Sequence, residues 1–390
     1  MSRDVVFSFA YASWGTAVAR GMCFSEDRMA QTLLSHPDVR RLIVAETPRS
    51  LPIKLAKDLL RPPPPFPADE RASLYSPLRL RRADPAGIGA VERTFQAWDA
   101  RMRRAAARRG LERPAVIATH PLIAGFAPLE WAESVTFYAF DDLAASPHLR
   151  RLRPAYEEAY RRIREQGRAV AAVAAAILER IRPTGPSAVV PNAVDPAEWA
   201  HPGPAPAWFA SLPQPRLLYV GSLESRIDVE ALGRAARAFP AASIALVGPL
   251  LEAAHFERLL GEPNVHLRPP APREEVVALV AAADACLIPH RDNALTESMS
   301  PLKLYEYLSG GAPVAAGDLR PIRGISPRVA VDDDLVSAIG AALEIGRAPD
   351  AERLRFAAEN SWQARQETIV EMALAPRGEL SPPRSGGRSE

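Results

Sequence analysis

The chain has 390 residues, of which 47% are hydrophobic and 24% are charged. This composition excludes a disordered chain, and the length predicts two domains rather than one. A formal net charge of +2 is too small to indicate a nucleic-acid-binding protein, and two cysteines exclude a disulfide framework and a cysteine-based metal site.

The N-terminus lacks the layout of a secretion signal. Its first residues, MSRDVVFSFAYASWG, contain no basic stretch followed by an apolar one. The longest apolar run, AVAAVAAAIL at 169–178, is too short to span a bilayer. We therefore expect a cytoplasmic protein.

The first half of the chain alternates apolar segments with amphipathic ones. The apolar segments are predicted strands, at 4–10, 40–46, 114–120, 134–142 and 168–175. Helical spacing lies between them, as in YEEAYRRIREQG at 156–167. The proline-rich segment 61–70 is predicted to be a surface loop, because proline continues neither kind of element.

The second half repeats this alternation more regularly. Its predicted strands lie at 216–223, 243–249, 264–269, 285–290 and 312–318, and its predicted helices at 228–239, 252–260, 273–284 and 300–311. Continuous apolar strands between amphipathic helices predict a parallel sheet that is covered on both faces. We therefore expect an α/β protein with two doubly wound, Rossmann-like domains that face a cleft. Ligands would bind at the carboxyl ends of the strands.

Lys303 is one of only three lysines among 48 basic residues, and it lies at the start of the predicted helix 300–311. Ser300 is expected to cap this helix, and Pro301 to occupy its first position. A lone cation in the first turn opposes the helix dipole unless an anion binds there, and helix N-termini are ready phosphate sites. We therefore interpret Lys303 as a diphosphate ligand and Glu306 as a ribose ligand. The alternative is an exposed Lys–Glu pair on a surface helix.

Five segments follow one another in an order that a known family shares. They are VVPNAVD at 189–195, LLYVGSLESRIDVEAL at 217–232, NVHLRPPAPREEVVALVAAADACLIPH at 264–290, HRDNALTESMSPLKLYEYLSGGAPVA at 290–315 and AAENSWQARQETIVEM at 357–372. Together they resemble the group 1 glycosyltransferases of GT-B fold, in glycosyltransferase family 4 and its relatives. The subgroup most similar in texture contains glycosyltransferases of polysaccharide and teichuronic-acid biosynthesis.

The resemblance implies a domain organisation and an activity. Residues 1–195 would form an acceptor-side domain and 196–355 a nucleotide-sugar domain, while a helix at 356–372 crosses back to the first domain. Residues 373–390 are rich in Pro, Gly, Ser and Arg, and we expect a disordered tail. The implied activity is retaining transfer of a hexose from a nucleoside-diphosphate sugar to a glycan or lipid-linked acceptor, in cell-envelope or exopolysaccharide synthesis.

The resemblance also implies residues of the donor site. Lys303 would contact the donor diphosphate and Glu306 the ribose, with Arg226 as a second basic contact. The other donor-side positions are Asn192, Gly221, Glu297, Met299, Ser300 and Pro301. One departure concerns the two glutamates that the family pattern separates by seven residues: Ser298 stands at the first of these positions, and Glu297 is one residue too early. The sugar contact and the retaining outcome therefore stay open.

The acceptor side offers other candidates. His120 occupies the position where many members of this family have a histidine beside the donor sugar; the alternative is a strand-end histidine that caps a helix. Asp141 and Asp142 follow a predicted strand and could orient the acceptor hydroxyl or act as a general base, or one could cap the next helix. Trp14 and Arg28 follow the first predicted strand, and we expect them to bind the acceptor, although Trp14 could equally be a buried core residue.

Metal and redox chemistry are not expected. No Asp-x-Asp motif follows a predicted strand, and the acidic run VDDD at 331–334 precedes a late helix instead. We expect no metal and no cofactor, with a UDP- or GDP-type sugar as donor substrate. Two other functions stay open, namely a non-catalytic GT-B subunit that binds a glycan or partner, and a nucleotide-sugar 2-epimerase. A nicotinamide dehydrogenase is disfavoured, because no G-x-G-x-x-G follows a strand.

The segment 49–113 carries 15 basic and 7 acidic residues, a local excess of +8. Basic clusters of this kind attract anionic surfaces. We therefore expect a glycan or polyprenyl-linked acceptor held at an anionic membrane surface, with the protein peripheral on the inner membrane face. The alternative is a solvated helix face. No nucleic-acid partner is expected.

Overall fold

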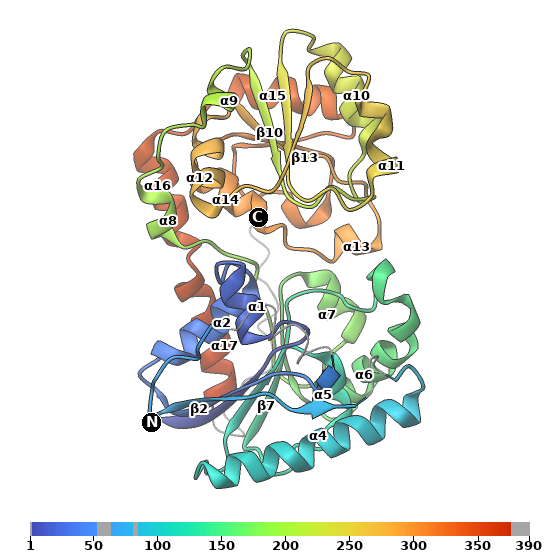
Figure 1. Ribbon diagram of the computed structural model, residues 1–390, viewed down its shortest axis with the longest axis vertical. Helices are drawn as coiled ribbons and strands as arrows, with labels where there is room; N and C mark the ends of the chain where they lie inside the picture. The colour runs from blue at the N-terminus through green and yellow to red at the C-terminus, as the bar shows by residue number, and fades with distance from the viewer. Residues whose placement is uncertain (1, 53–63, 81–84, 376–390) are drawn as a thin grey trace, which may run out of the picture. The chain divides into compact units, whose positions relative to one another are not determined.

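The computed structural model of the protein describes residues 2–52, 64–80 and 85–375 (Figure 1). The chain divides into two compact units. The N-terminal unit runs to Pro191 and includes the segment from Arg365 on, and the C-terminal unit spans residues 192–364. Helix α17 (Trp362–Leu374) therefore begins in one unit and ends in the other. The start of the predicted tail is thus helical, and its part from residue 376 on lies outside the described residues.

The N-terminal unit contains a parallel sheet that has seven strands within the described ranges, in the order β4-β2-β1-β6-β7-β8-β9. Their bounds are β1 (Arg3–Ser8), β2 (Val39–Ala45), β4 (Ala72–Tyr75), β6 (Ala115–Ala118), β7 (Ser134–Ala139), β8 (Ala169–Ala172) and β9 (Ser187–Val189). The central strands are almost entirely buried, as expected of a sheet covered on both faces. The five predicted strands are confirmed, whereas β4 and β9 were not predicted.

Helices cover this sheet on both sides. They are α1 (Trp14–Ala19), α2 (Ser25–Ser35), α4 (Ile88–Arg108), α5 (Pro121–Phe126), α6 (Arg153–Glu165) and α7 (Ala175–Ile181), with the 3₁₀ turn η1 (Pro147–Leu152). Helices α4, α5 and α6 pack on one another, and α2 packs on β2. Gln366 connects α17 to α2 by two hydrogen bonds: its amide donates to the Ser25 carbonyl and accepts from the Thr32 hydroxyl. A short strand pair, β3 (Arg49–Ser50) and β5 (Leu78–Arg79), lies apart from the main sheet.

The C-terminal unit contains a second parallel sheet, with the order β12-β11-β10-β13-β14-β15. Its strands are β10 (Arg216–Val220), β11 (Ser243–Val247), β12 (Val265–Arg268), β13 (Ala285–Ile288), β14 (Val314–Ala316) and β15 (Val329–Val331). The chain starts at β10, adds β11 and β12 on one side, and then crosses to β13 on the other. The loops after β10 and β13 therefore diverge, which makes this point the expected ligand site of a doubly wound sheet.

Two apolar clusters lie on the two faces of this second sheet. One lies under α10 (Val229–Ala238) and α15 (Leu335–Ile345). The other lies under α8 (Pro196–Ala200), α12 (Arg273–Ala282), α14 (Leu302–Ser309) and α16 (Asp350–Glu359). The remaining short elements are α9 (Ala207–Ala210), α11 (Ala253–Phe256), α13 (Ala294–Glu297), η2 (Glu257–Leu259) and η3 (Arg320–Ile322). In the part of the chain that the structure describes, no helix combines the length and the apolar character needed to cross a bilayer.

Candidate functional site

The side chain of Lys303 points into the C-terminal unit rather than into solvent. The residue is partly exposed, but its ammonium is enclosed and lies 5.1 Å from the centre of the Tyr219 ring at the end of β10. Among the described residues, none accepts a hydrogen bond from Nζ or forms an ion pair with it. Burial, reinforced by the nearby charge of Arg226, lowers the pKa of Lys303 to about 8. The alternative of an exposed Lys–Glu pair is therefore wrong.

Gly221 keeps the space beside this ammonium open. It directly follows β10 and has a φ of +150°, which side-chain-bearing residues rarely adopt. A Cβ at this position would lie 3.2 Å from Cε and 3.3 Å from Nζ of Lys303, and 3.0 Å from the Tyr219 hydroxyl. The glycine thus allows the lysine to reach the end of the strand.

Helix α14 begins without a side-chain cap, which corrects one prediction. Pro301 is the residue before the helix, and no side chain accepts from the first-turn N–H groups. The Ser300 hydroxyl, expected to cap, instead accepts from the backbone N–H of Asn192 at 3.0 Å. The Asn192 amide also donates to the Ser300 carbonyl at 2.6 Å. Because the serine is engaged elsewhere, the N–H groups at the start of α14 are left for another acceptor.

Arg226 lies in the loop after β10, near enough to Lys303 for its charge to lower the lysine pKa. Its guanidinium pairs with Glu224, and its Nη1 lies 3.7 Å from the Met299 sulfur. Its buried Nε has no hydrogen-bond partner within the described ranges. The structure therefore brings together three predicted donor-side residues, Arg226, Met299 and Lys303, although their contact with a donor stays a prediction.

Glu306 lies one turn after Lys303 but is paired with another residue. Its Oε1 lies 2.5 Å from Nη1 of Arg273, which also pairs with Glu198 at 2.7 Å. Burial alone would lower the pKa of Arg273, but its two carboxylate partners raise it above its usual value. The guanidinium also lies over the Trp199 ring, 5.2 Å from its centre. A ribose contact would therefore have to share this carboxylate with the arginine.

The departure at Ser298 has a clear structural form. Its hydroxyl donates to the carbonyls of Ala294 and Leu295 inside its own helical turn, and the residue is 3% exposed. Glu297, the last residue of α13, is exposed. The position of the family's first glutamate therefore presents a satisfied hydroxyl, and a role for Glu297 stays a prediction.

His120 in the N-terminal unit caps a helix. It follows β6, its Nδ1 accepts from the backbone N–H of Leu122 at 3.1 Å, and the residue is 3% exposed. The rings of Tyr11 and Phe95 lie 5.1 and 5.5 Å from its own. His120 therefore caps the helix through Nδ1, as the alternative interpretation expected. Its contact with a donor sugar stays a prediction.

The two adjacent acids after β7 differ in their surroundings. Asp142 is buried, pairs with Arg180 at 2.8 Å and accepts from the Tyr160 hydroxyl at 3.1 Å. Its backbone N–H donates to the Asp141 carboxylate, which is partly exposed. These contacts favour a structural role for Asp142 and make Asp141 the better candidate for a base.

The predicted acceptor residues also differ. Trp14 is 6% exposed, its indole N–H donates to the Pro65 carbonyl and its ring packs edge-on against Phe66. Trp14 is thus a buried core residue, which was the alternative to acceptor binding. Arg28, on α2, is partly exposed and lies 3.5 Å from the Gln31 side chain, so it remains an acceptor candidate.

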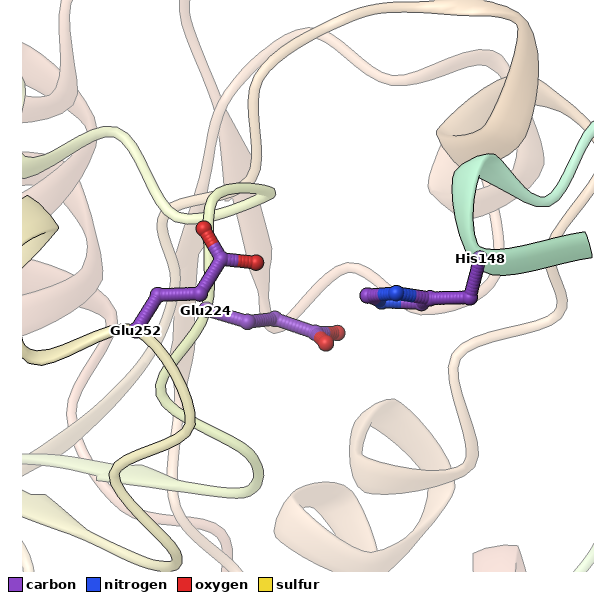
Figure 2. A group of neighbouring side chains, drawn as sticks. All are labelled: His148, Glu224 and Glu252. Carbon is purple, nitrogen blue, oxygen red and sulfur yellow. The ribbon is translucent and has the colours of Figure 1, made fainter. Parts of the chain in front are cut away.

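Two carboxylates on the loops after β10 and β11 lie near each other (Figure 2). Glu224 pairs with Arg226, and Glu252 accepts from the Ser225 hydroxyl at 3.1 Å. The third residue drawn there, His148, belongs to the N-terminal unit. Two carboxylates that already have partners in their own unit do not make a metal site.

A cavity in the described part of the N-terminal unit lies away from these candidates. It measures about 950 Å³, and its lining includes Ser134 and Ala169, the first residues of β7 and β8. His120 and Asp141 instead follow the ends of strands. Because ligands of doubly wound sheets bind at the carboxyl ends of strands, this cavity is not the expected active site.

The sequence did not single out two residues of the C-terminal site, Arg273 and His290. Arg273 lies 33 positions before Glu306, so no local pattern connects them. His290 closes the predicted strand segment 285–290, and this place at a strand end was the available signal; its nearness to Lys303 is seen only in the structure.

In sequence, the chain resembles a known glycosyltransferase over part of its length. No known family model matches the chain. TuaH, a proposed teichuronic acid biosynthesis glycosyltransferase of Bacillus subtilis, is 30% identical over 105 residues, which is 26% of each chain. The match thus spans about a quarter of that relative's length.

Solved structures extend the likeness to nearly the whole chain. Sucrose-phosphate synthase from Thermosynechococcus elongatus has a TM-score of 0.65 at 15% identity, over 95% of this chain and 98% of its own. The trehalose-6-phosphate protein from E. coli bound with UDP-2-fluoro glucose has a TM-score of 0.64 at 11% identity, over 96% and 100%. The predicted fold is confirmed: this is an α/β chain with two parallel sheets and the GT-B fold.

Proposed function

We propose that the protein is a glycosyltransferase that binds a nucleoside-diphosphate sugar at the carboxyl edge of its second sheet. The observation that carries this proposal is the enclosed ammonium of Lys303 at the uncapped start of α14, without an anionic partner among the described residues. Helix N–H groups and a lysine are the donors that a diphosphate requires. The GT-B fold and the partial likeness to TuaH support the same function.

The chemistry follows from where charge develops. The bond between the anomeric carbon and the diphosphate oxygen breaks, and its electron pair remains on the phosphate. Lys303 and the first N–H groups of α14 would stabilise that negative charge in place. The acceptor oxygen forms the new bond to the anomeric carbon. Its proton would pass to the leaving phosphate in a retaining reaction, or to Asp141 in an inverting one.

The acceptor is proposed to be a glycan or polyprenyl-linked glycan of the cell envelope. TuaH supports this proposal, because it is described as a glycosyltransferase of teichuronic acid biosynthesis. Helix α4 adds a basic surface, because one face is buried and arginines are exposed on the other, at positions 101, 103, 104 and 108. Flotation with liposomes should show a preference for anionic lipids; binding that ignores lipid charge would contradict the membrane part of the proposal.

The donor site is tested by calorimetric titration with UDP, GDP and dTDP. We expect one of the three to bind the wild type. Lys303→Ala should weaken that binding by about 1.5–3 kcal/mol, the usual loss of a charge-assisted hydrogen bond. Arg258→Ala is the matched control, because it removes an exposed cation that pairs with Glu230 in the same unit. Equal losses in both variants, or no binding at all, would contradict the proposed site.

A non-catalytic GT-B subunit is the second candidate, and the satisfied hydroxyl of Ser298 is what favours it. Such a protein would bind a glycan without turning over a sugar donor. Incubation of the protein with UDP-sugar and a lipid-linked glycan, followed by product analysis, separates the two. Free nucleotide with an extended glycan supports the transferase. A changed sugar without any acceptor would instead indicate a 2-epimerase.

A further inference from the structure

His290 is a buried histidine whose ring nitrogens have no hydrogen-bond partner among the described residues. It follows β13 directly after Pro289, and it is 5% exposed. Neither Nδ1 nor Nε2 has a hydrogen-bond partner in the described part of the chain. Buried polar groups in native proteins are nearly always hydrogen-bonded, so an imidazole with two unpartnered nitrogens requires an explanation.

The surroundings of His290 belong to the diphosphate site. Its ring lies edge-on to Tyr219, with centres 6.1 Å apart, and Lys303 Nζ lies 5.1 Å from the same tyrosine ring. The charged groups that act on the imidazole are Lys303, from α14, and Arg226, from the loop after β10. Tyr219 stays neutral, because burial raises its pKa to about 12. Burial, followed by the two positive charges, holds the pKa of His290 well below its usual range. Without a ligand the imidazole is thus neutral and lies near two cations, of which Arg226 is paired with Glu224.

We propose that His290 is the proton acceptor of the diphosphate site, a positioning residue that becomes charged when a nucleoside diphosphate binds beside Lys303 and Arg226. This inference rests on the proposed function, since it needs the donor to bind there. It adds to that function a third cationic group and a defined coupling of donor binding to proton uptake.

The coupling follows from charge balance. Burial is the main reason that His290 is neutral, and the two cations add to it. A bound diphosphate diester brings two negative charges beside these cations. The anion cancels their repulsion and attracts an imidazolium, so the protonated form gains stability on binding. Because the bound state then holds more protons than the empty one, donor affinity rises as pH falls through the range between the empty and bound pKa values of His290. Lys303 contributes separately, around pH 8, where its own pKa lies.

The test is calorimetric titration of UDP-glucose and GDP-mannose across roughly pH 5.5–8.5, the range in which histidines titrate. At each pH the titration is repeated in two buffers with different ionisation enthalpies, which reports the protons taken up per ligand. These sugars are used because their diphosphates are diesters and stay fully ionised throughout. The wild type should take up a proton below pH 7, approaching about one per ligand. His290→Gln, which cannot titrate, should lose that uptake and bind with an affinity that no longer rises in acid.

His266→Gln is the matched control. His266 is a partly exposed histidine on β12, in the same unit but on the edge strand. It should leave the uptake unchanged. His290→Asn serves as a second variant, and thermal melting confirms that each variant is folded. NMR supplies an independent readout, because the one histidine signal missing in His290→Gln should show the shift of an imidazolium on ligand binding.

The outcomes separate this inference from the function it rests on. If a donor binds and the wild type takes up the same number of protons as His290→Gln, the inference fails while the proposed function stands. If neither sugar nucleotide nor inorganic pyrophosphate binds, both fail together. Uptake lost only in His290→Gln and His290→Asn establishes the coupling.

Discussion

Arg273 on α12 and Glu306 on α14 form an ion pair in the C-terminal unit, in which Nη1 of the arginine lies 2.5 Å from Oε1 of the glutamate. The same guanidinium holds Glu198 at 2.7 Å. The carboxylate expected to bind a ribose is therefore already oriented by a partner that the sequence did not indicate. An oriented carboxylate loses little conformational freedom on binding, which is an advantage for a ligand contact.

This arrangement predicts a selective effect of Glu306→Gln. The variant should weaken UDP or GDP binding by about 1 kcal/mol, the net contribution of a typical hydrogen bond. Inorganic pyrophosphate has no ribose, so its binding should not change. Glu198→Gln is the control, because it disturbs the same arginine without a predicted ligand contact. Calorimetry on both ligands measures the difference, and equal losses for nucleotide and pyrophosphate would contradict the ribose contact.

Lys303→Met should make the folded protein more stable while weakening nucleotide binding. Methionine is similar in length to lysine. It replaces an enclosed ammonium that forms no ion pair with any residue that the structure describes. The lowered pKa of Lys303 indicates a cost of holding that charge, and we expect a gain of about 1–3 kcal/mol. Thermal melting should show the rise in Tm. A lower Tm would mean that the ammonium is satisfied in the empty protein.

The sequence predicted the parts of the fold that depend on local patterns. Continuous apolar segments such as 216–223 and 285–290 indicated buried parallel strands, and the structure confirms them as β10 and β13. Strands such as β9 and β15 were not predicted: they have three residues each, too few for a period to show. Strand β14 is equally short, but it lies within the longer predicted segment 312–318.

The site could be predicted only where spacing along the helix carries the signal. Lys303 and Glu306 lie three residues apart, so their shared face follows from helical geometry. The prediction that Ser300 caps the helix was wrong, because a cap preference is local, whereas the hydroxyl accepts from the backbone of Asn192, 108 positions away in the sequence. His290 shows the same limit, since its lack of hydrogen-bond partners, seen over the described residues, depends on the folded surroundings.

Asp142→Asn should destabilise the N-terminal unit. The buried carboxylate pairs with Arg180 and accepts from the Tyr160 hydroxyl, and its loss leaves both donors poorly matched. We expect a decrease of about 1–3 kcal/mol in stability, measured by thermal or chemical denaturation. Asp141→Asn should melt close to the wild type and lose activity if Asp141 is the base. If Asp141→Asn lost stability and Asp142→Asn lost only activity, the structural role would belong to Asp141 and the role of base to Asp142.

Donor affinity should also fall in alkaline solution. Lys303 has a pKa of about 8 in the empty protein, below its usual value, because of burial and the charge of Arg226. A diphosphate favours the charged ammonium, so the bound state has the higher pKa and binds more protons above pH 8. By linkage, affinity must then decrease as pH rises through 8, at most about tenfold per pH unit, and it levels off above the bound-state pKa. Below about pH 7 the lysine is already charged, so it contributes no further change there.

Lys303→Arg provides the matched control for that alkaline decrease. The variant should bind more weakly at pH 7, because a forked guanidinium replaces a compact ammonium. Arginine stays protonated over this range, so the affinity of the variant should fall little further up to about pH 9.5. Titration with UDP or GDP is suitable, since the terminal phosphate of the nucleotide, with a pKa near about 6, is already ionised. A decrease of the same steepness in wild type and Lys303→Arg would place the titrating group elsewhere. A decrease confined to the wild type identifies Lys303 as the cation that meets the diphosphate.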